Sequence, residues 1–297
     1  MNRIAKIVAA AFASAGLIAS AAACGGGQSA STGESGTVNV VASVNQWGTL
    51  AEELGGKNVE VASIVHTTNV DPHDYEPTTA DISKLQKAQV IVVNGADYDA
   101  WAVKAAKNTK ATVVNAAEVG GVEEGGNPHI WFSASVRKSV AAAITKAYEK
   151  ADASKKADFD KLNMQWQNDE GKVESKIAEV RKKAEGLNYA ATESVAYYLA
   201  EDMGLKDATP AGYAQASANE SEPTASDIKQ YVDILKSGGV DLLVVNTQEE
   251  SNMTKKLTDA AESANVPEVK LTEQMPRQYD SLTDWMSVLV DSFNQAV

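Results

Sequence analysis

The feature that most constrains the fold is a long helical segment in the middle of the chain. Residues 154–185 contain no proline and one glycine. Apolar residues recur there mostly at steps of three, four or seven, at Phe159, Leu162, Trp166, Val173, Ile177 and Val180. This pattern predicts a helix of about 30 residues, roughly 45 Å long. Because that is longer than one small β/α lobe, we expect the helix to link two lobes.

Short strands alternate with helices on both sides of this segment. The predicted strands are Val38–Ser43, Val59–Ile64, Val90–Asn94, Ala111–Asn115, Tyr189–Thr192, Asp241–Asn246 and Glu268–Leu271. Such alternation predicts parallel sheets covered by helices on both faces. We therefore predict an α/β fold of two β/α lobes with parallel sheets, joined by one long rigid helix. The N-terminal lobe is expected at residues 37–153, the linking helix at 154–186 and the C-terminal lobe at 187–297.

The N-terminus has the pattern of a sorting signal. Two basic residues precede an uncharged, alanine-rich run that is too short for a good membrane span. The single cysteine, Cys24, follows this run directly and resembles the cysteine of a bacterial lipobox. We predict a signal peptide at residues 1–23, lipidation of Cys24 and a flexible Gly/Ser/Thr-rich tether at residues 24–36. Ala21 stands where a lipobox usually has leucine, so cleavage by ordinary signal peptidase remains an alternative.

Composition excludes several classes of function. The chain has 27 basic and 40 acidic residues, a net charge of −13, which disfavours nucleic acid and anionic membrane surfaces as partners. An acidic chain of this kind would need a lipid anchor to stay at a membrane. One cysteine excludes an intramolecular disulfide framework and a cysteine-based zinc site. With only three histidines, any metal site must rely on carboxylates.

Two of the three histidines lie in matching contexts. His73 and His129 both occur in the pattern Asp/Asn-Pro-His-x-aromatic. Proline fixes its own φ and biases the preceding residue towards extended geometry, so each imidazole is presented from a stiff loop. A preorganised imidazole suits a metal site, and histidine is the commonest metal ligand. We predict His73 and His129 as metal ligands, with purely structural loop histidines as the alternative; His66 lacks this context and is expected at a loop surface.

Two histidines do not complete a coordination shell, so carboxylates should supply the rest. Open α/β sheets place ligands at the carboxyl ends of their strands. Glu193 directly follows a predicted strand, and Asp280 follows the last strand and opens the last helix. Each could instead act only at a helix N-terminus. Position alone leaves both interpretations open.

At these residues the chain resembles a known family. The stretches Asp71–Pro77, Asn127–Trp131 and Thr192–Tyr198 are similar to those of the solute-binding lipoproteins of zinc/manganese ABC transporters, the cluster A-I metal-binding family. The resemblance covers nearly everything from Val38 to the end. It implies one divalent metal ion in the cleft between the lobes. It also implies high-affinity capture outside the cytoplasm by a monomer lipid-anchored to the cell membrane, and delivery to an ABC permease and its ATPase for import.

The resemblance also implies a ligand set. The two histidine ligands of the family fall on His73 and His129, and the third ligand falls on Glu193. The fourth, an aspartate before the last helix, best matches Asp280, which stands six residues before Met286. Some relatives have a Thr-Glu-x-x-Pro stretch in this region, here residues 272–276, which makes Glu273 the alternative fourth ligand.

The identity of the metal stays open between manganese and zinc. Carboxylate oxygens suit manganese, whereas the general affinity order favours zinc over manganese. Two functions remain as alternatives to capture of a bare metal ion: binding of a metal chelate of the siderophore type, and catalysis by a secreted metallohydrolase. No HExxH motif is present, and a closed four-ligand site fits capture better than turnover. We therefore expect a transport protein that is not an enzyme.

Overall fold

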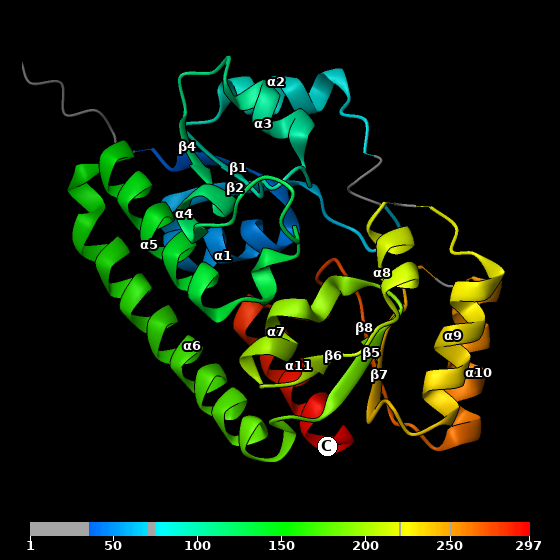
Figure 1. Cartoon of the computed structure of the whole chain (residues 1–297). Coiled ribbons are helices and arrows are strands. Elements are labelled where there is room, and N and C mark those ends of the chain that lie inside the picture. The colour runs from blue at the N-terminus through cyan, green and yellow to red at the C-terminus, as the bar shows by residue number, and fades with distance from the viewer. Residues whose placement is uncertain (1–35, 71–74, 220, 250) are drawn as a thin grey trace, which may run out of the picture. The chain divides into compact units, whose positions relative to one another are not determined.

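The computed structural model describes residues 36–70, 75–219, 221–249 and 251–297. The predicted signal peptide, the predicted tether up to residue 35, Cys24 and His73 lie outside the described residues. Within them the chain forms two four-stranded parallel sheets (Figure 1). The strand order β2-β1-β3-β4 of the first sheet recurs as β6-β5-β7-β8 in the second. The predicted α/β class with two parallel sheets is therefore confirmed.

The first sheet is built from the apolar runs that the sequence predicted. Its elements are β1 (Val38–Val44), α1 (Asn45–Gly55), β2 (Val59–Val65), α2 (Thr79–Lys87), β3 (Val90–Val93), α3 (Ala100–Ala106), β4 (Thr112–Asn115), α4 (Ala116–Gly120) and α5 (Ala134–Ala151). A 3-10 turn, η2 (Ile130–Phe132), precedes α5. Val40 of β1 pairs with Val61 on one side and Val90 on the other. All four residues of β3 are buried, as expected for a strand covered on both faces.

The second sheet has the same plan. Its elements are β5 (Asn188–Ala191), η4 (Ser194–Ala196), α7 (Tyr197–Asp202), β6 (Lys206–Asp207), α8 (Ala211–Ala218), α9 (Ala225–Lys236), β7 (Leu242–Asn246), α10 (Asn252–Ala264), β8 (Glu268–Leu271) and α11 (Leu282–Ala296). Strand β6 and helix α8 were not predicted. The two residues of β6 are exposed and carry no apolar signal, and α8 consists mostly of small residues without an apolar stripe.

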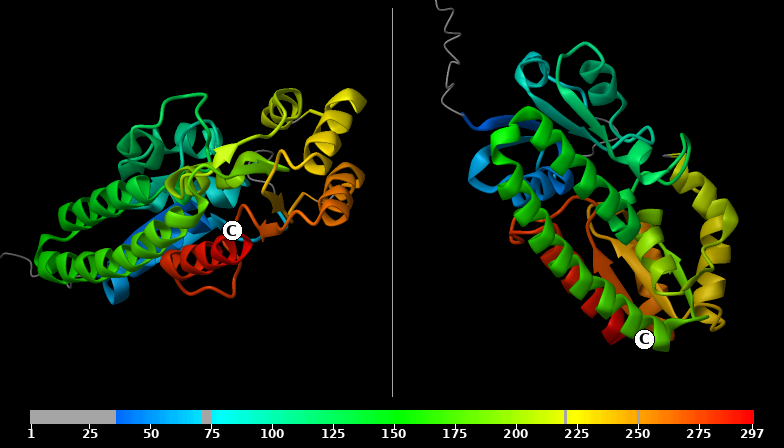
Figure 2. Two further views of the ribbon diagram at one scale, coloured as in Figure 1. Left: turned by 60° about the horizontal axis from the view of Figure 1, so that its bottom comes forward. Right: turned by 90° about the vertical axis from the view of Figure 1, so that its left-hand side faces the viewer.

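The predicted linking helix is α6 (Lys156–Ala184), which is preceded by a 3-10 turn and has 29 residues. It packs against α5 on one side and α11 on the other, so it runs past elements of both sheets (Figures 1 and 2). Its buried apolar face includes Phe159, Trp166, Val173, Ile177 and Val180, which are part of the stripe that predicted the helix. Burial of that stripe, more than helix propensity, stabilises a helix of this composition.

One hydrophobic core is shared by both halves of the fold, that is, by the first sheet with its helices and the second sheet with its helices. Its buried side chains include Trp47 of α1, Phe159 of α6, Leu242 of β7 and Trp285 of α11. The ring centroids of Phe132 and Trp285, from the first and second halves, are 5.4 Å apart. The opposite face of each sheet packs on helices of its own, α2 and α3 for the first and α9 and α10 for the second. The two halves therefore share their principal core.

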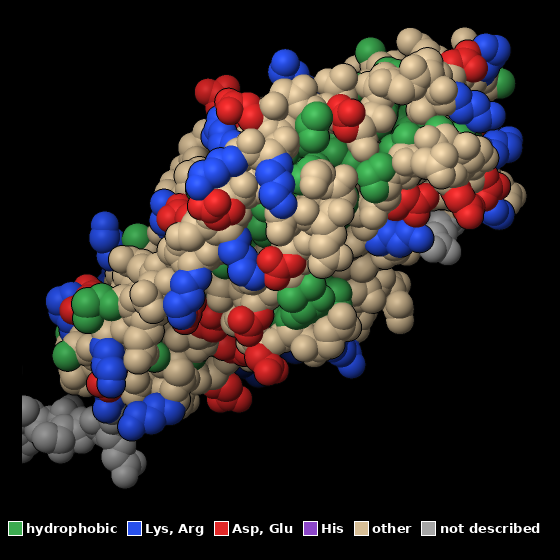
Figure 3. Space-filling model, turned by 90° about the horizontal axis from the view of Figure 1, so that it is seen from below, with side chains coloured by type: hydrophobic (Ala, Val, Ile, Leu, Met, Phe, Trp, Pro, Cys, Tyr) green, Lys and Arg blue, Asp and Glu red, His purple; other side chains and the backbone are tan. Residues whose placement is uncertain are grey.

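The surface gives few further constraints. Figure 3 shows basic and acidic side chains interspersed on the face seen from below, without a large patch of one sign. Of the helices in the described ranges, none combines the length and the apolar character needed to cross a bilayer.

A pair of substitutions on α6 tests the shared core. Trp166 is 3% exposed and Met164, two residues earlier, is 63% exposed. Trp166→Ala should lower the free energy of unfolding by about 3–5 kcal/mol, because it leaves a cavity in the core. Met164→Ala should change it by less than about 0.5 kcal/mol. Urea unfolding of residues 36–297 measures both, and we expect a single transition because the halves share one core.

Two separate unfolding transitions, with only one of them shifted by Trp166→Ala, would contradict this description of the core.

Candidate metal centre

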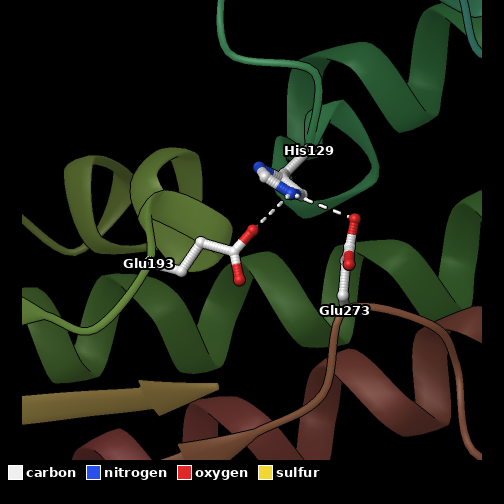
Figure 4. A group of neighbouring side chains, drawn as sticks. All are labelled: His129, Glu193 and Glu273. Carbon is white, nitrogen blue, oxygen red and sulfur yellow. Dashed lines mark ion pairs between the residues drawn. The ribbon is translucent and has the colours of Figure 1, made fainter. Parts of the chain in front are cut away.

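Three side chains with metal-binding atoms converge at one point (Figure 4). The His129 Nε2 atom lies 3.7 Å from Glu193 Oε1 and 3.3 Å from Glu273 Oε1. One such atom from each of the three residues lies within 4.8 Å of the others. The side chains of His129 and Glu273 are 3% exposed and that of Glu193 is 17% exposed. An imidazole with two carboxylates is a donor set suited to divalent transition metals.

The orientation of the His129 ring is fixed by Asn127. The Asn127 side-chain amide donates to the carbonyl oxygen of Ser194 (2.8 Å) and to its hydroxyl oxygen (3.1 Å), which identifies the nitrogen end of that amide. The Asn127 Oδ1 atom then accepts from the His129 backbone N–H (2.9 Å) and lies 2.9 Å from His129 Nδ1. Because an amide oxygen only accepts, Nδ1 carries the ring proton. Nε2, the nitrogen that is left for metal ligation, therefore faces the carboxylates.

Glu193 is positioned by the carboxyl ends of two neighbouring strands. It stands two residues after the end of β5, and its Oε2 accepts from the side-chain amide of Asn246, the last residue of β7 (2.6 Å). The intervening Thr192 is held on both sides. Its hydroxyl accepts from the Asn246 N–H (3.0 Å), and its carbonyl oxygen accepts from the Tyr213 hydroxyl (3.0 Å). The carboxylate is thus fixed at the edge where open α/β sheets bind ligands.

Glu273 is bound by groups from the first half of the chain. Its Oε1 accepts from the Tyr98 hydroxyl (2.7 Å), and its carbonyl oxygen accepts from the Gln46 side-chain amide (3.0 Å). Gln274 also donates to the Tyr98 hydroxyl oxygen (3.0 Å). Burial, and then the charge of Glu273, raise the pKa of Tyr98 well above its usual value. The phenol therefore stays protonated and acts as a donor to the carboxylate.

The loop that carries Tyr98 is stiff. The Asp99 carboxylate accepts from the backbone N–H groups of Asn94 (2.7 Å) and Gly95 (2.8 Å), at the end of β3. Gly95 has φ +77°, and a Cβ there would lie 2.2 Å from the side-chain oxygen of Asn115, so another residue would not fit. The Asn94 side chain in turn donates to the carbonyl oxygen of Pro128 (2.9 Å), which connects this loop to the one that carries His129.

The sequence-predicted residues are only partly brought together. His129 and Glu193 are in the cluster, and so is Glu273, the alternative fourth ligand. Asp280 is exposed and is not part of the cluster; Ser281, rather than Asp280, caps α11 by accepting from the Asp284 N–H (3.0 Å). His73 lies outside the described residues. His66 is exposed, as expected.

A repeated dipeptide could have pointed to Glu273. Thr192-Glu193 follows β5 directly, and Thr272-Glu273 follows β8 directly, so both glutamates stand two residues beyond a strand end. A residue at that distance stays at the carboxyl edge of the sheet. Asp280 lies nine residues beyond β8, far enough along the chain to leave that edge.

A cleft leads to the cluster. It has a volume of about 750 Å³ and is lined by His129 and Glu193 together with residues of α8, α10 and the segment between α8 and α9. Glu249 also lines it. Burial, and then the charges of Glu193 and Glu249, raise the pKa of the Tyr213 hydroxyl in this cleft to about 12. Glu193, Glu222 and Glu249 all line the cleft, and their carboxylates give it a negative potential that attracts cations.

Residues 40–296 match the family described as zinc-uptake complex component A, periplasmic. The chain belongs to this family. Its resemblance to metal-transport solute-binding proteins is thus confirmed, and the expectation of a transport component that is not an enzyme agrees with the family.

The curated relatives share about a quarter of the aligned residues with this chain. The chain is 25% identical over 197 residues to the high-affinity zinc uptake system protein ZnuA of Bacillus subtilis, a match to 59% of this chain and 60% of that protein. It is 25% identical over 269 residues to the manganese ABC transporter substrate-binding lipoprotein PsaA of Streptococcus anginosus, covering 84% of each. Among solved structures, the periplasmic zinc binding protein TroA of Treponema pallidum superposes with a TM-score of 0.75 at 18% identity, over 88% of this chain and 99% of that one. This last similarity supports the fold.

Proposed function

We propose that the protein captures one divalent transition-metal ion outside the cytoplasm and delivers it to an ABC permease, whose ATPase powers import. The observation that carries this proposal is the convergence of His129, Glu193 and Glu273 at the end of an electronegative cleft. Two carboxylates held this close repel each other, and a bound cation removes that repulsion. We further propose that the protein works as a monomer, since all three residues come from one chain.

We propose that His73 is a ligand together with His129 and Glu193, and that Glu273 is the fourth ligand in place of Asp280. The Pro-His context of His73 matches that of His129. The chain also approaches the cluster shortly before His73. The carbonyl oxygen of Thr68 accepts from the Gln248 side chain (3.1 Å), and Gln248 also donates to the side chain of Gln274, which follows Glu273. Asp280 is left out of this set because it is exposed.

We propose manganese or zinc as the metal. Glu193 and Glu273 can each bind through one or two oxygens, which allows the five or six ligands that manganese accepts and the four that zinc prefers. The relatives support both: the Bacillus protein is named for zinc and the streptococcal protein for manganese.

Metal binding by purified variants tests the function and the ligand set. The metal-free wild type should take up one Mn²⁺ or Zn²⁺ ion per chain, and its native mass should correspond to a monomer without an organic molecule. Glu273→Gln should weaken binding more than about 100-fold, since loss of even an outer partner of a ligand costs 10–100-fold. Asp280→Asn, the matched control in the same loop, should change it less than about twofold. Competition with a metal-sensitive chelator measures both.

A larger loss in Asp280→Asn than in Glu273→Gln would reject this ligand set. Uptake of an intact metal chelate, with no binding of the bare ion, would instead favour the siderophore-type alternative.

We also propose that Cys24 is lipidated and anchors the protein to the cell membrane. The support is the sequence before Cys24 and the word lipoprotein in the name of the streptococcal relative. Expressed in a bacterial host with its full N-terminus, the protein should partition into the membrane fraction with a mature N-terminus at Cys24. Cys24→Ala should remove the lipid while leaving metal affinity unchanged. A mature wild-type N-terminus at any other residue would reject the anchor.

A further inference from the structure

A buried ion pair joins α5 to α6 close to the loop that carries His129. Arg137 of α5 and Glu170 of α6 are both 0% exposed. The guanidinium binds the carboxylate through two bonds, from Nε to Oε2 (3.0 Å) and from Nη2 to Oε1 (2.5 Å). A bidentate pair of this kind fixes the orientation of the guanidinium plane as well as its position. The two helices lie side by side (Figure 1).

The remaining arm of the guanidinium reaches the loop of His129. Arg137 Nη1 donates to the carbonyl oxygen of Trp131 (3.0 Å), two residues after His129. Trp131 is fully buried, and its ring meets the His129 ring edge-on, with centroids 5.5 Å apart. Movement of the Trp131 backbone would therefore move the imidazole directly.

Two other bonds hold the opposite end of the same loop. The Tyr198 hydroxyl donates to the carbonyl oxygen of Asn127 (2.9 Å), and Asn94 donates to that of Pro128. These bonds come from the second sheet's α7 and from the end of β3. The Arg137 bond differs from them, because it holds the residues after His129 and ties them to α6, the helix shared by both halves.

We infer that Arg137, oriented by Glu170, is a positioning residue that fixes His129 for metal binding by holding the Trp131 carbonyl oxygen. This inference rests on the proposed function in taking His129 as a ligand. Arg137 does not touch the metal; it sets where the imidazole stands. Outer groups that orient a ligand commonly change metal affinity by 10–100-fold.

The test must separate positioning from stability, because removing one partner of a buried pair leaves the other charge uncompensated. The double variant Arg137→Met with Glu170→Met replaces both charges by apolar side chains of similar length, a change that is often neutral or stabilising. The Trp131 carbonyl oxygen then loses its donor. A matched control uses Lys138 and Glu174, a pair on the same two helices with side chains 48% and 38% exposed. Both are replaced by Met as well.

Three quantities are measured on each protein with Mn²⁺ and Zn²⁺ as probes: the metal dissociation constant, the thermal midpoint of the metal-free form, and the ring resonances of the histidines by NMR. The chain has three histidines, so His129→Gln assigns the resonance of His129. We expect the Arg137/Glu170 variant to keep its thermal midpoint, to raise the dissociation constant about tenfold, and to shift the His129 resonance. The Lys138/Glu174 control should leave the metal affinity and the resonance unchanged.

Arg137→Lys provides a second route if the double variant does not fold. It keeps a positive charge beside Glu170. An ammonium group lacks the planar set of N–H donors with which the guanidinium binds Glu170 and the Trp131 carbonyl oxygen at the same time, so the same loss of affinity is expected. Wild-type metal affinity in whichever of these variants folds would overturn the inference. Failure of the wild type to bind metal would instead reject the proposed function, and the His129 resonance would still report whether Arg137 positions the ring.

Discussion

The close approach of two carboxylates to one imidazole is the constraint on which the functional architecture depends. Glu193 and Glu273 extend from β5 and β8, which are separated in the second sheet by β7, and His129 comes from the first half of the chain. Placing two negative charges close together away from water is unfavourable in free energy. The surrounding structure must therefore hold them there. The carboxylates accept hydrogen bonds from Asn246 and Tyr98, and the His129 ring donates one to Asn127.

The shared core explains how ligands from different halves keep a fixed spacing. Trp47, Phe159 and Trp285 belong to one cluster that joins the first sheet, α6 and α11. The bonds from Gln46 and Tyr98 to Glu273 also cross between the halves. His129, Glu193 and Glu273 are held in this way before any ion binds, so little of the binding free energy should be spent on ordering these three residues. We therefore expect metal capture to change the charge balance in the cleft more than the arrangement of the halves.

Most of the fold could be predicted from the sequence because its signals are periodic and local. Helix α6 has an apolar stripe at helical spacing, and strands such as β3 are short apolar runs between turn residues. Strand β6 and helix α8 lack such signals. The metal-binding residues were harder to predict than the fold. His129 and Glu193 have local signals in the sequence. The choice between Glu273 and Asp280 depends on how the ten-residue segment between β8 and α11 folds back on Tyr98 and Gln46. Those contacts are between residues far apart in the chain, so no local pattern encodes them. The local signal that does favour Glu273 is its place in a Thr-Glu pair directly after β8, which repeats the Thr192-Glu193 pair after β5.

Anomalous X-ray diffraction from crystals of the metal-loaded protein, measured at the absorption edge of manganese or zinc, locates the ion and its ligands. We predict one anomalous peak per chain, about 2.0–2.3 Å from His129 Nε2 and from a carboxylate oxygen of both Glu193 and Glu273. A peak coordinated by Asp280, with Glu273 remote from it, would show that this ligand set is wrong.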